Sequence, residues 1–134
     1  MSELTITASK VQGDIAVTIL HLSGHLHGAT EKDLLDYARQ AHEDGAKHLL
    51  LDMSGLEVLS SAGLRAIHSV FNLFTPQSDK DLIHEHHEEP YKSPYMKLVC
   101  PNPQIYYVLN IAGFLQNLII YNNMDEAIKS FASQ

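Results

Sequence analysis

The stretch "HLLLDMSGLEVLSSAGLRAI", residues 48–67, contains an apolar run, a turn-like segment and the start of a helical pattern. The apolar run ends in Asp52 and is continuous, as in strands that are buried on both faces of a parallel sheet. From Ser61 onward, apolar residues recur on one helical face, namely Leu64, Ile67, Phe71 and Phe74. The stretch therefore predicts a buried strand that leads through a turn into an amphipathic helix.

The segments before this stretch indicate a hairpin and a helix. Residues 4–11 alternate apolar and polar side chains, and residues 14–22 are rich in β-branched ones, with a turn at Gly13 between them. Apolar residues then recur at helical spacing between Thr30, a candidate N-cap, and Gly45, a candidate stop. We expect a β-hairpin followed by a helix.

The segments after the stretch repeat the alternation of strands and helices. Residues 96–100 and 118–121 are short apolar runs that indicate strands. Asn102 is a candidate N-cap for a helix that ends near Gly113, and Asn123 is a candidate N-cap for a last helix.

This order of elements predicts an α/β fold. We expect a single-layer, mostly parallel sheet with an N-terminal β-hairpin, alternating helices and right-handed crossovers. A length of 134 residues suits one domain, which we place over residues 1–134.

Residues 75–95 interrupt this rhythm. The segment lacks sustained periodicity, is rich in acidic residues and holds His84, His86 and His87. Its composition offers little apolar area to offset the entropy of ordering, so we expect a mobile, solvent-exposed loop insertion. The three histidines are weak candidates for a zinc or nickel site. His21, His25 and His27 share strand parity but are expected to contact water in an exposed turn.

Charge and cysteine content restrict the partners. With 16 acidic residues against nine Lys and Arg, the formal net charge is -7, which argues against nucleic acid and anionic membranes as partners. The single cysteine, Cys100, excludes a disulfide framework and a cysteine-based metal site. No apolar run approaches the roughly 18 residues of a membrane span. We expect a cytoplasmic protein that binds a protein or a small molecule.

Ser60 and Ser61 allow three interpretations: helix caps, a nucleophile, or acceptors of a modification. They follow the carboxyl end of the predicted strand and open the next helix, where open α/β sheets place their sites. The helix dipole there favours an anion, so a phosphate on either hydroxyl is structurally tolerated. Capping and modification are compatible with each other.

A catalytic triad of a serine, His68 and Asp52 does not fit the pattern. His68 lies on the same continuous helix as Ser61, roughly 10 Å away along the axis at 1.5 Å per residue. The residues around the serines do not match the Gly-x-Ser-x-Gly elbow, and there is no Gly-rich phosphate loop. These patterns argue against a serine nucleophile and against nucleotide hydrolysis.

The residues "LLLDMSGLEVLSSAGLRAI" resemble the central signature of STAS domains, especially bacterial anti-sigma factor antagonists. The matching positions are Asp52, Ser61, Gly63 and Leu64. Residues 22–30 and 97–128 also look like the corresponding parts of that family, so the resemblance covers nearly the whole chain except residues 75–95.

The resemblance implies a partner switch in the regulation of transcription. The unphosphorylated domain is expected to bind an anti-sigma factor that is also a serine kinase, which releases the sigma factor. Phosphorylation of Ser61 is expected to reverse this, and a metal-dependent serine phosphatase to remove the phosphate. ATP and metal belong to those partners, so this chain is expected to need no cofactor, to hold no catalytic residue and to have no enzymatic activity of its own. Whether it forms a homodimer stays open.

The resemblance also implies a set of partner-binding residues, which comprises Asp52, Ser60, Gly63, Leu64 and Arg65. Arg65 is one turn beyond Ser61 and is a candidate partner for its phosphate. Ser60 stands where the family usually has an acidic residue, which makes it an alternative phosphoacceptor. Two other functions stay open: an unphosphorylated scaffold or ligand-binding module, and a metal sensor that uses the histidine-rich loop.

Overall fold

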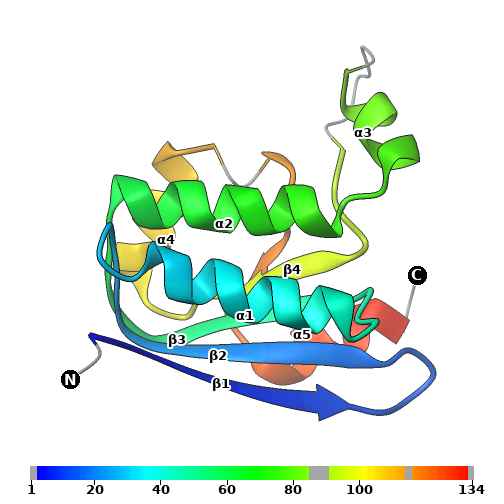
Figure 1. Cartoon of the computed structure of the whole chain (residues 1–134), viewed down its shortest axis with the longest axis horizontal. Coiled ribbons are helices and arrows are strands. Elements are labelled where there is room, and N and C mark those ends of the chain that lie inside the picture. The colour runs from blue at the N-terminus through cyan, green and yellow to red at the C-terminus, as the bar shows by residue number, and fades with distance from the viewer. Residues whose placement is uncertain (1–2, 85–90, 114–115, 133–134) are drawn as a thin grey trace.

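The computed structural model describes residues 3–84, 91–113 and 116–132, and Figure 1 shows their arrangement. The strands are β1 (Leu4–Val11), β2 (Val17–Leu26), β3 (Leu49–Leu59), β4 (Met96–Val99) and β5 (Ile120–Tyr121). The helices are α1 (Glu31–Glu43), α2 (Ser61–Phe74), α3 (Gln77–His84), α4 (Pro103–Ile111) and α5 (Met124–Ala132). None of these helices is long and apolar enough to span a bilayer.

The five strands form one sheet in the order β1-β2-β3-β4-β5. β1 is antiparallel to β2, and the other pairs are parallel, which confirms the predicted hairpin and mostly parallel sheet. Because the strands follow in sequence order, crossovers of one hand place the linking helices α1, α2 and α4 on one face. Figure 1 shows α1 and α2 side by side over that face.

The two faces of the sheet bury cores of different size. The larger core lies under α1, α2 and α4 and includes Leu34, Ile67 and Leu109. The smaller core lies under α5, where Phe131 packs with a few strand residues that include Leu50. His21 and Asp52, two residues beyond Ile19 and Leu50 on their strands, continue this second face with polar side chains.

Two predicted caps and two predicted stops are confirmed. Asn102 accepts from the N–H of Gln104 at 2.9 Å, and Asn123 accepts from that of Glu126 at 3.1 Å. The stops that end α1 and α4 are glycines with positive φ, Gly45 at 101° and Gly113 at 83°.

The predicted cap at Thr30 is wrong in its chemistry. Thr30 occupies the N-cap position of α1, but its side chain makes no capping hydrogen bond. Its buried hydroxyl accepts from the N–H of His27 at 3.1 Å and donates to the carbonyl of His25 at 2.8 Å. The Thr30 hydroxyl is therefore bonded to the backbone of the turn before α1 and does not cap the helix.

β3 is longer than the apolar run predicts, since the expected turn after Asp52 is wrong. Residues 49–52 pair with both β2 and β4. Residues 53–59 continue as strand but pair with β2 alone, and the register shifts twice between His21 and His25. These irregularities break the two-residue alternation by which a strand is recognised.

The expectation of a loop throughout residues 75–95 is wrong for α3. Ile83 packs against the larger core, and the hydroxyl of Tyr91 donates to Asp79 at 2.5 Å. Burial, then the hydrogen bond to Asp79, raises the pKa of Tyr91 above its usual range, which keeps the hydroxyl protonated. The segment rejoins the body at Ser93, which is buried and donates its N–H to the carbonyl of Asn117 at 2.9 Å.

The metal candidates of this segment cannot be placed. His86 and His87 lie outside the described residues, as does the side chain of His84. The sensor hypothesis through this loop stays a prediction.

Candidate functional site

Ser60 and Ser61 lie at the junction of β3 and α2 and differ in role. Ser60 is the N-cap, with φ -97° and ψ 176°, and its side chain accepts from the N–H of Gly63 at 3.3 Å. Its own N–H donates to the carbonyl of Leu26 at 3.1 Å. Ser61 is the first helical residue and is exposed. One serine therefore builds the helix start, and the other presents its hydroxyl to solvent.

The start of α2 suits a negatively charged group. Its first turn contains no acidic residue. The first N–H groups of a helix lack intrahelical acceptors, and the helix dipole places partial positive charge there. Arg65, one turn further, is exposed. An anion attached to Ser61 would meet these groups without displacing a buried side chain.

Gly63 and Leu64 hold α2 against the sheet. A Cβ added at Gly63 would lie 2.5 Å from the carbonyl oxygen of Leu26 and 2.8 Å from Cδ1 of Leu59. Leu64 is half-buried and packs against the larger core. Of the residues that the resemblance singles out, Ser61 and Arg65 thus have the most open surface, and Gly63 is needed for close packing.

Asp52 is not brought close to the serines. It lies in the first half of β3, and at about 3.3 Å per residue the chain between Asp52 and Ser60 extends on the order of 25 Å. Its carboxylate accepts from Ser54 and is 2.7 Å from Nδ1 of His21. Burial opposes ionisation, but the hydrogen bonds from Ser54 and His21 outweigh it and hold the pKa of Asp52 below its ordinary value.

The rejected triad is also separated in the structure. His68 is exposed on α2, where its Nδ1 lies 3.4 Å from the side-chain amide of Asn72. Asp52 is occupied by His21 and Ser54. Asp52 and His68 thus each have a hydrogen-bond partner other than Ser60 and Ser61.

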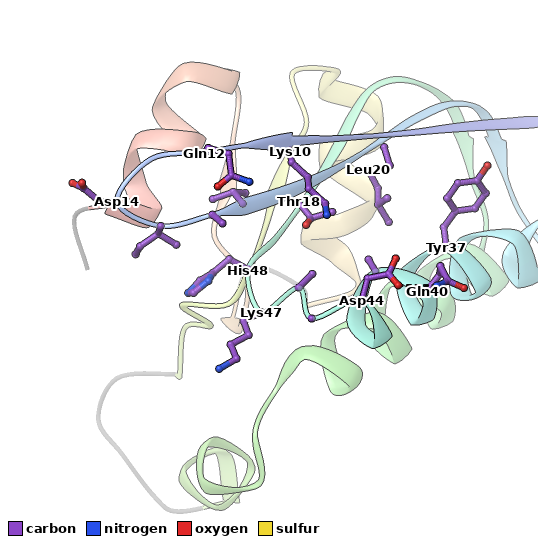
Figure 2. Close-up of a pocket in the computed structure, with 17 residues that line it drawn as sticks. Lys10, Gln12, Asp14, Thr18, Leu20, Tyr37, Gln40, Asp44, Lys47 and His48 are labelled. Carbon is purple, nitrogen blue, oxygen red and sulfur yellow. Dashed lines mark hydrogen bonds between the residues drawn. The ribbon is translucent and has the colours of Figure 1, made fainter.

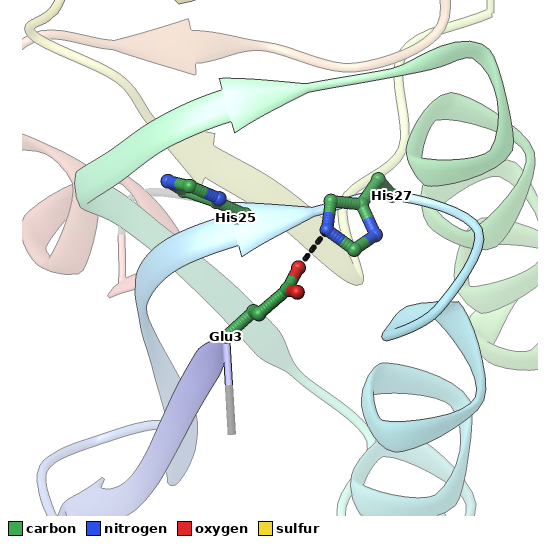
Figure 3. Close-up of side chains that lie close together, drawn as sticks. All are labelled: Glu3, His25 and His27. Carbon is green, nitrogen blue, oxygen red and sulfur yellow. Dashed lines mark hydrogen bonds and ion pairs between the residues drawn. The ribbon is translucent and has the colours of Figure 1, made fainter. Parts of the chain in front are cut away.

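The expectation that His21, His25 and His27 contact water in an exposed turn is wrong for His21 and His25, which lie in β2, and it missed that all three contact carboxylates. His21 pairs with Asp52, and His25 Nε2 lies 3.4 Å from Glu57. His27 pairs with Glu3 through its Nε2, as Figure 3 shows. Their shared parity was visible in the sequence, but the partners depend on strand register, which places His21 directly beside Asp52.

Comparison with known proteins supports the fold. The family model of the STAS domain matches residues 7–80. No curated protein matches the chain significantly. Among solved structures, an anti-sigma factor antagonist from Mycobacterium paratuberculosis is 18% identical, with a TM-score of 0.72 over 96% of this chain and 95% of its own.

Two structures of SpoIIAA are also similar. The anti-sigma factor antagonist SpoIIAA in its unphosphorylated form is 12% identical, with a TM-score of 0.61 over 96% of this chain and 98% of its own. The Bacillus cell fate determinant SpoIIAA in the phosphorylated form is 14% identical, with a TM-score of 0.59 over 93% of this chain and 97% of its own. At these identities the likeness is one of fold. Because the STAS family model matches more than half of the residues of this chain, the chain belongs to the STAS domain family.

Proposed function

We propose that this domain is an anti-sigma factor antagonist that switches partners through phosphorylation of Ser61. The unphosphorylated domain binds an anti-sigma factor that is also a serine kinase, and this binding releases the sigma factor. Phosphate on Ser61 blocks the binding, and a serine phosphatase restores it. ATP and metal ions serve the partner enzymes, and this chain, in the cytoplasm, acts as substrate and binder.

The observation that carries the proposal is the exposed hydroxyl of Ser61 at the start of α2. Ser60, the alternative acceptor, is only partly exposed, and its oxygen already accepts from the N–H of Gly63. A kinase can reach the Ser61 hydroxyl without disturbing the helix cap that Ser60 forms. The similar fold of SpoIIAA, whose structure is known in phosphorylated and unphosphorylated forms, supports the same reading.

The physical effect of the phosphate is local. It adds about 1.5 to 2 negative charges at pH 7 to an exposed surface. The helix start and Arg65 accommodate this charge within the free domain. A partner that covers Ser61 must instead desolvate the phosphate and any acidic groups near it. Binding therefore weakens while the fold stays the same.

Phosphate mapping by mass spectrometry, on chain isolated from its native cells with its bound partners, tests the proposal. We expect phosphate on Ser61 and an ATP-dependent kinase among the partners of the unphosphorylated form. Ser61→Ala should abolish the modification and retain partner binding. Ser60→Asn is the matched control, because asparagine keeps the N-cap but removes the alternative acceptor.

Two results would contradict the assignment. Phosphate that persists in Ser61→Ala and disappears in Ser60→Asn would move the acceptor to Ser60. A kinase that binds the domain but modifies neither serine would leave a STAS scaffold without phosphorylation.

A cavity supports a second candidate function, a ligand-binding module. It has a volume of about 580 Å³ and lies between the β1–β2 hairpin and the end of α1. Figure 2 shows Lys10 and Thr18 on its sheet side and Tyr37 and Asp44 on its helix side. Burial, with nearby Lys97 and Lys47, lowers the pKa of His48, which lines the cavity, and so favours the neutral imidazole. Native mass spectrometry of the purified chain would detect a retained small molecule.

A further inference from the structure

A second cluster of side chains has the composition of a metal centre. Glu3, His25 and His27 each place an atom able to ligate a metal within 4.8 Å of the others. Figure 3 shows Glu3 and His27 pointing toward each other, Glu3 from just before β1 and His27 from the turn after β2, with His25 beside them. We propose that these three side chains bind a divalent transition-metal ion, zinc(II).

The ligand chemistry fits zinc. Two imidazoles and one carboxylate are a ligand set that zinc takes in proteins, with a fourth position left for water or another ligand. His25 Nε2 lies 3.4 Å from Glu57, so a carboxylate is close enough to pair with this nitrogen when the other nitrogen of the ring binds a metal. The Glu3 side chain is 55% exposed against 25% for His27, so an ion can enter from the solvent side.

The backbone around the cluster is held in place by hydrogen bonds. The N–H of His25 donates to the carbonyl of Glu3 at 2.9 Å, next to Gly24, whose φ of 105° only glycine adopts readily. The buried hydroxyl of Thr30 bonds the N–H of His27 and the carbonyl of His25. Three ligands from two distant segments are thus fixed in register before an ion arrives.

Zinc binding must rearrange one proton. The N–H of Ala29 donates to Nδ1 of His27 at 3.1 Å, so the metal-free ring carries its proton on Nε2 and donates it to Glu3. A metal on Nε2 requires the proton to move to Nδ1, which breaks the bond to Ala29. This loss makes the affinity lower than that of a closed structural zinc site, and we expect a micromolar dissociation constant.

The location connects the cluster to the start of α2. Leu26, between the two histidines, accepts the N–H of Ser60 through its carbonyl. A Cβ at Gly28 would lie 3.8 Å from Cβ of Ala62. Zinc therefore joins the residue before β1 to the turn that contacts the helix bearing Ser61. The metal site does not depend on phosphorylation of that serine.

Calorimetric titration of the untagged full chain with zinc chloride tests the site. We expect the cluster to bind one ion per chain. Glu3→Gln and His27→Gln should each lower the affinity for zinc at least about 10-fold, since loss of even an outer partner of a metal ligand costs that much. His21→Gln is the matched control, because His21 pairs with Asp52 and should leave zinc affinity unchanged.

The histidine-rich segment needs its own control. A chain with His84→Gln, His86→Gln and His87→Gln together should keep the cluster's affinity. Zinc should raise the thermal midpoint of this chain by several degrees, and Glu3→Gln should abolish that rise while leaving the zinc-free midpoint nearly unchanged. The proposal is overturned by zinc binding that survives Glu3→Gln and His27→Gln, or by a chain that takes up no zinc.

Discussion

The two halves of β3 have opposite surroundings. Residues 49–52 lie between β2 and β4, and the three leucines among them are completely buried. Residues 53–59 pair with β2 alone, and Val58 there is 41% exposed. The first half lies in the centre of the sheet, and the second is an edge that still places three side chains in the larger core and carries the chain to Ser60 and Ser61. A single strand thus supplies both the stability of the domain and the position of its candidate site.

The difference between the two halves shows under what conditions an apolar pattern in the sequence predicts a strand. A strand buried on both faces is continuously apolar, and the run that ends in Asp52 is recognisable for that reason. In the second half, the buried residues are Met53, Leu56 and Leu59, three positions apart. This spacing is neither the period of a strand nor that of a helix, because the register shifts interrupt the alternation.

The largest contrast should appear in how much a substitution in each half lowers the free energy of unfolding. Leu51→Ala removes a side chain with 0% exposure and leaves a cavity, so we expect the free energy of unfolding to fall by about 2 to 5 kcal/mol. Val58→Ala should lower it by about 0.5 kcal/mol or less, because that side chain is already partly in water. Urea unfolding of both variants measures the difference. Equal losses would mean that the edge half is packed as tightly as the central half.

Features of the candidate site that depend on neighbouring residues could be predicted from the sequence, whereas those that depend on residues far apart in the sequence could not. The placement of Ser61 at a helix start is a local consequence of an apolar run followed by a helical pattern, and it was predicted. The pairing of His27 with Glu3 joins a residue just before β1 to one just after β2, and it depends on a register that no local pattern specifies. α3 was missed for a similar reason, since Tyr91 and the larger core support it from outside its own sequence.

Asp52 marks the boundary between the halves and should give the domain a pH dependence. Its folded pKa lies below the unfolded value of 3.8, because hydrogen bonds from Ser54 and His21 outweigh burial. Its stabilisation is therefore fully present above that unfolded value and is lost as the pH falls through the folded one. We expect Asp52→Asn to lower the free energy of unfolding by roughly 1 to 2 kcal/mol near neutral pH.

The loss caused by Asp52→Asn should shrink in acid. Urea unfolding at about pH 6 and about pH 3 measures it, with the wild type protonating at the lower pH and approaching the variant. Asp44→Asn, at the exposed end of α1, is the matched control and should change the free energy of unfolding by less than about 0.5 kcal/mol. A loss that is the same at both pH values would show that the carboxylate charge contributes nothing.

The smallest expected changes in the free energy of unfolding concern Ser60 and Ser61, at the end of the edge half, and they should differ between the two serines. Ser60→Ala removes the acceptor of the Gly63 N–H and should lower the free energy of unfolding by about 1 kcal/mol. Ser60→Asn should recover most of this loss. Ser61→Ala changes only an exposed hydroxyl and should stay within about 0.5 kcal/mol of the wild type. Thermal and urea unfolding measure all three. A larger loss for Ser61→Ala than for Ser60→Ala would make Ser61 the structural serine, and the proposed phosphorylation would lose its main support.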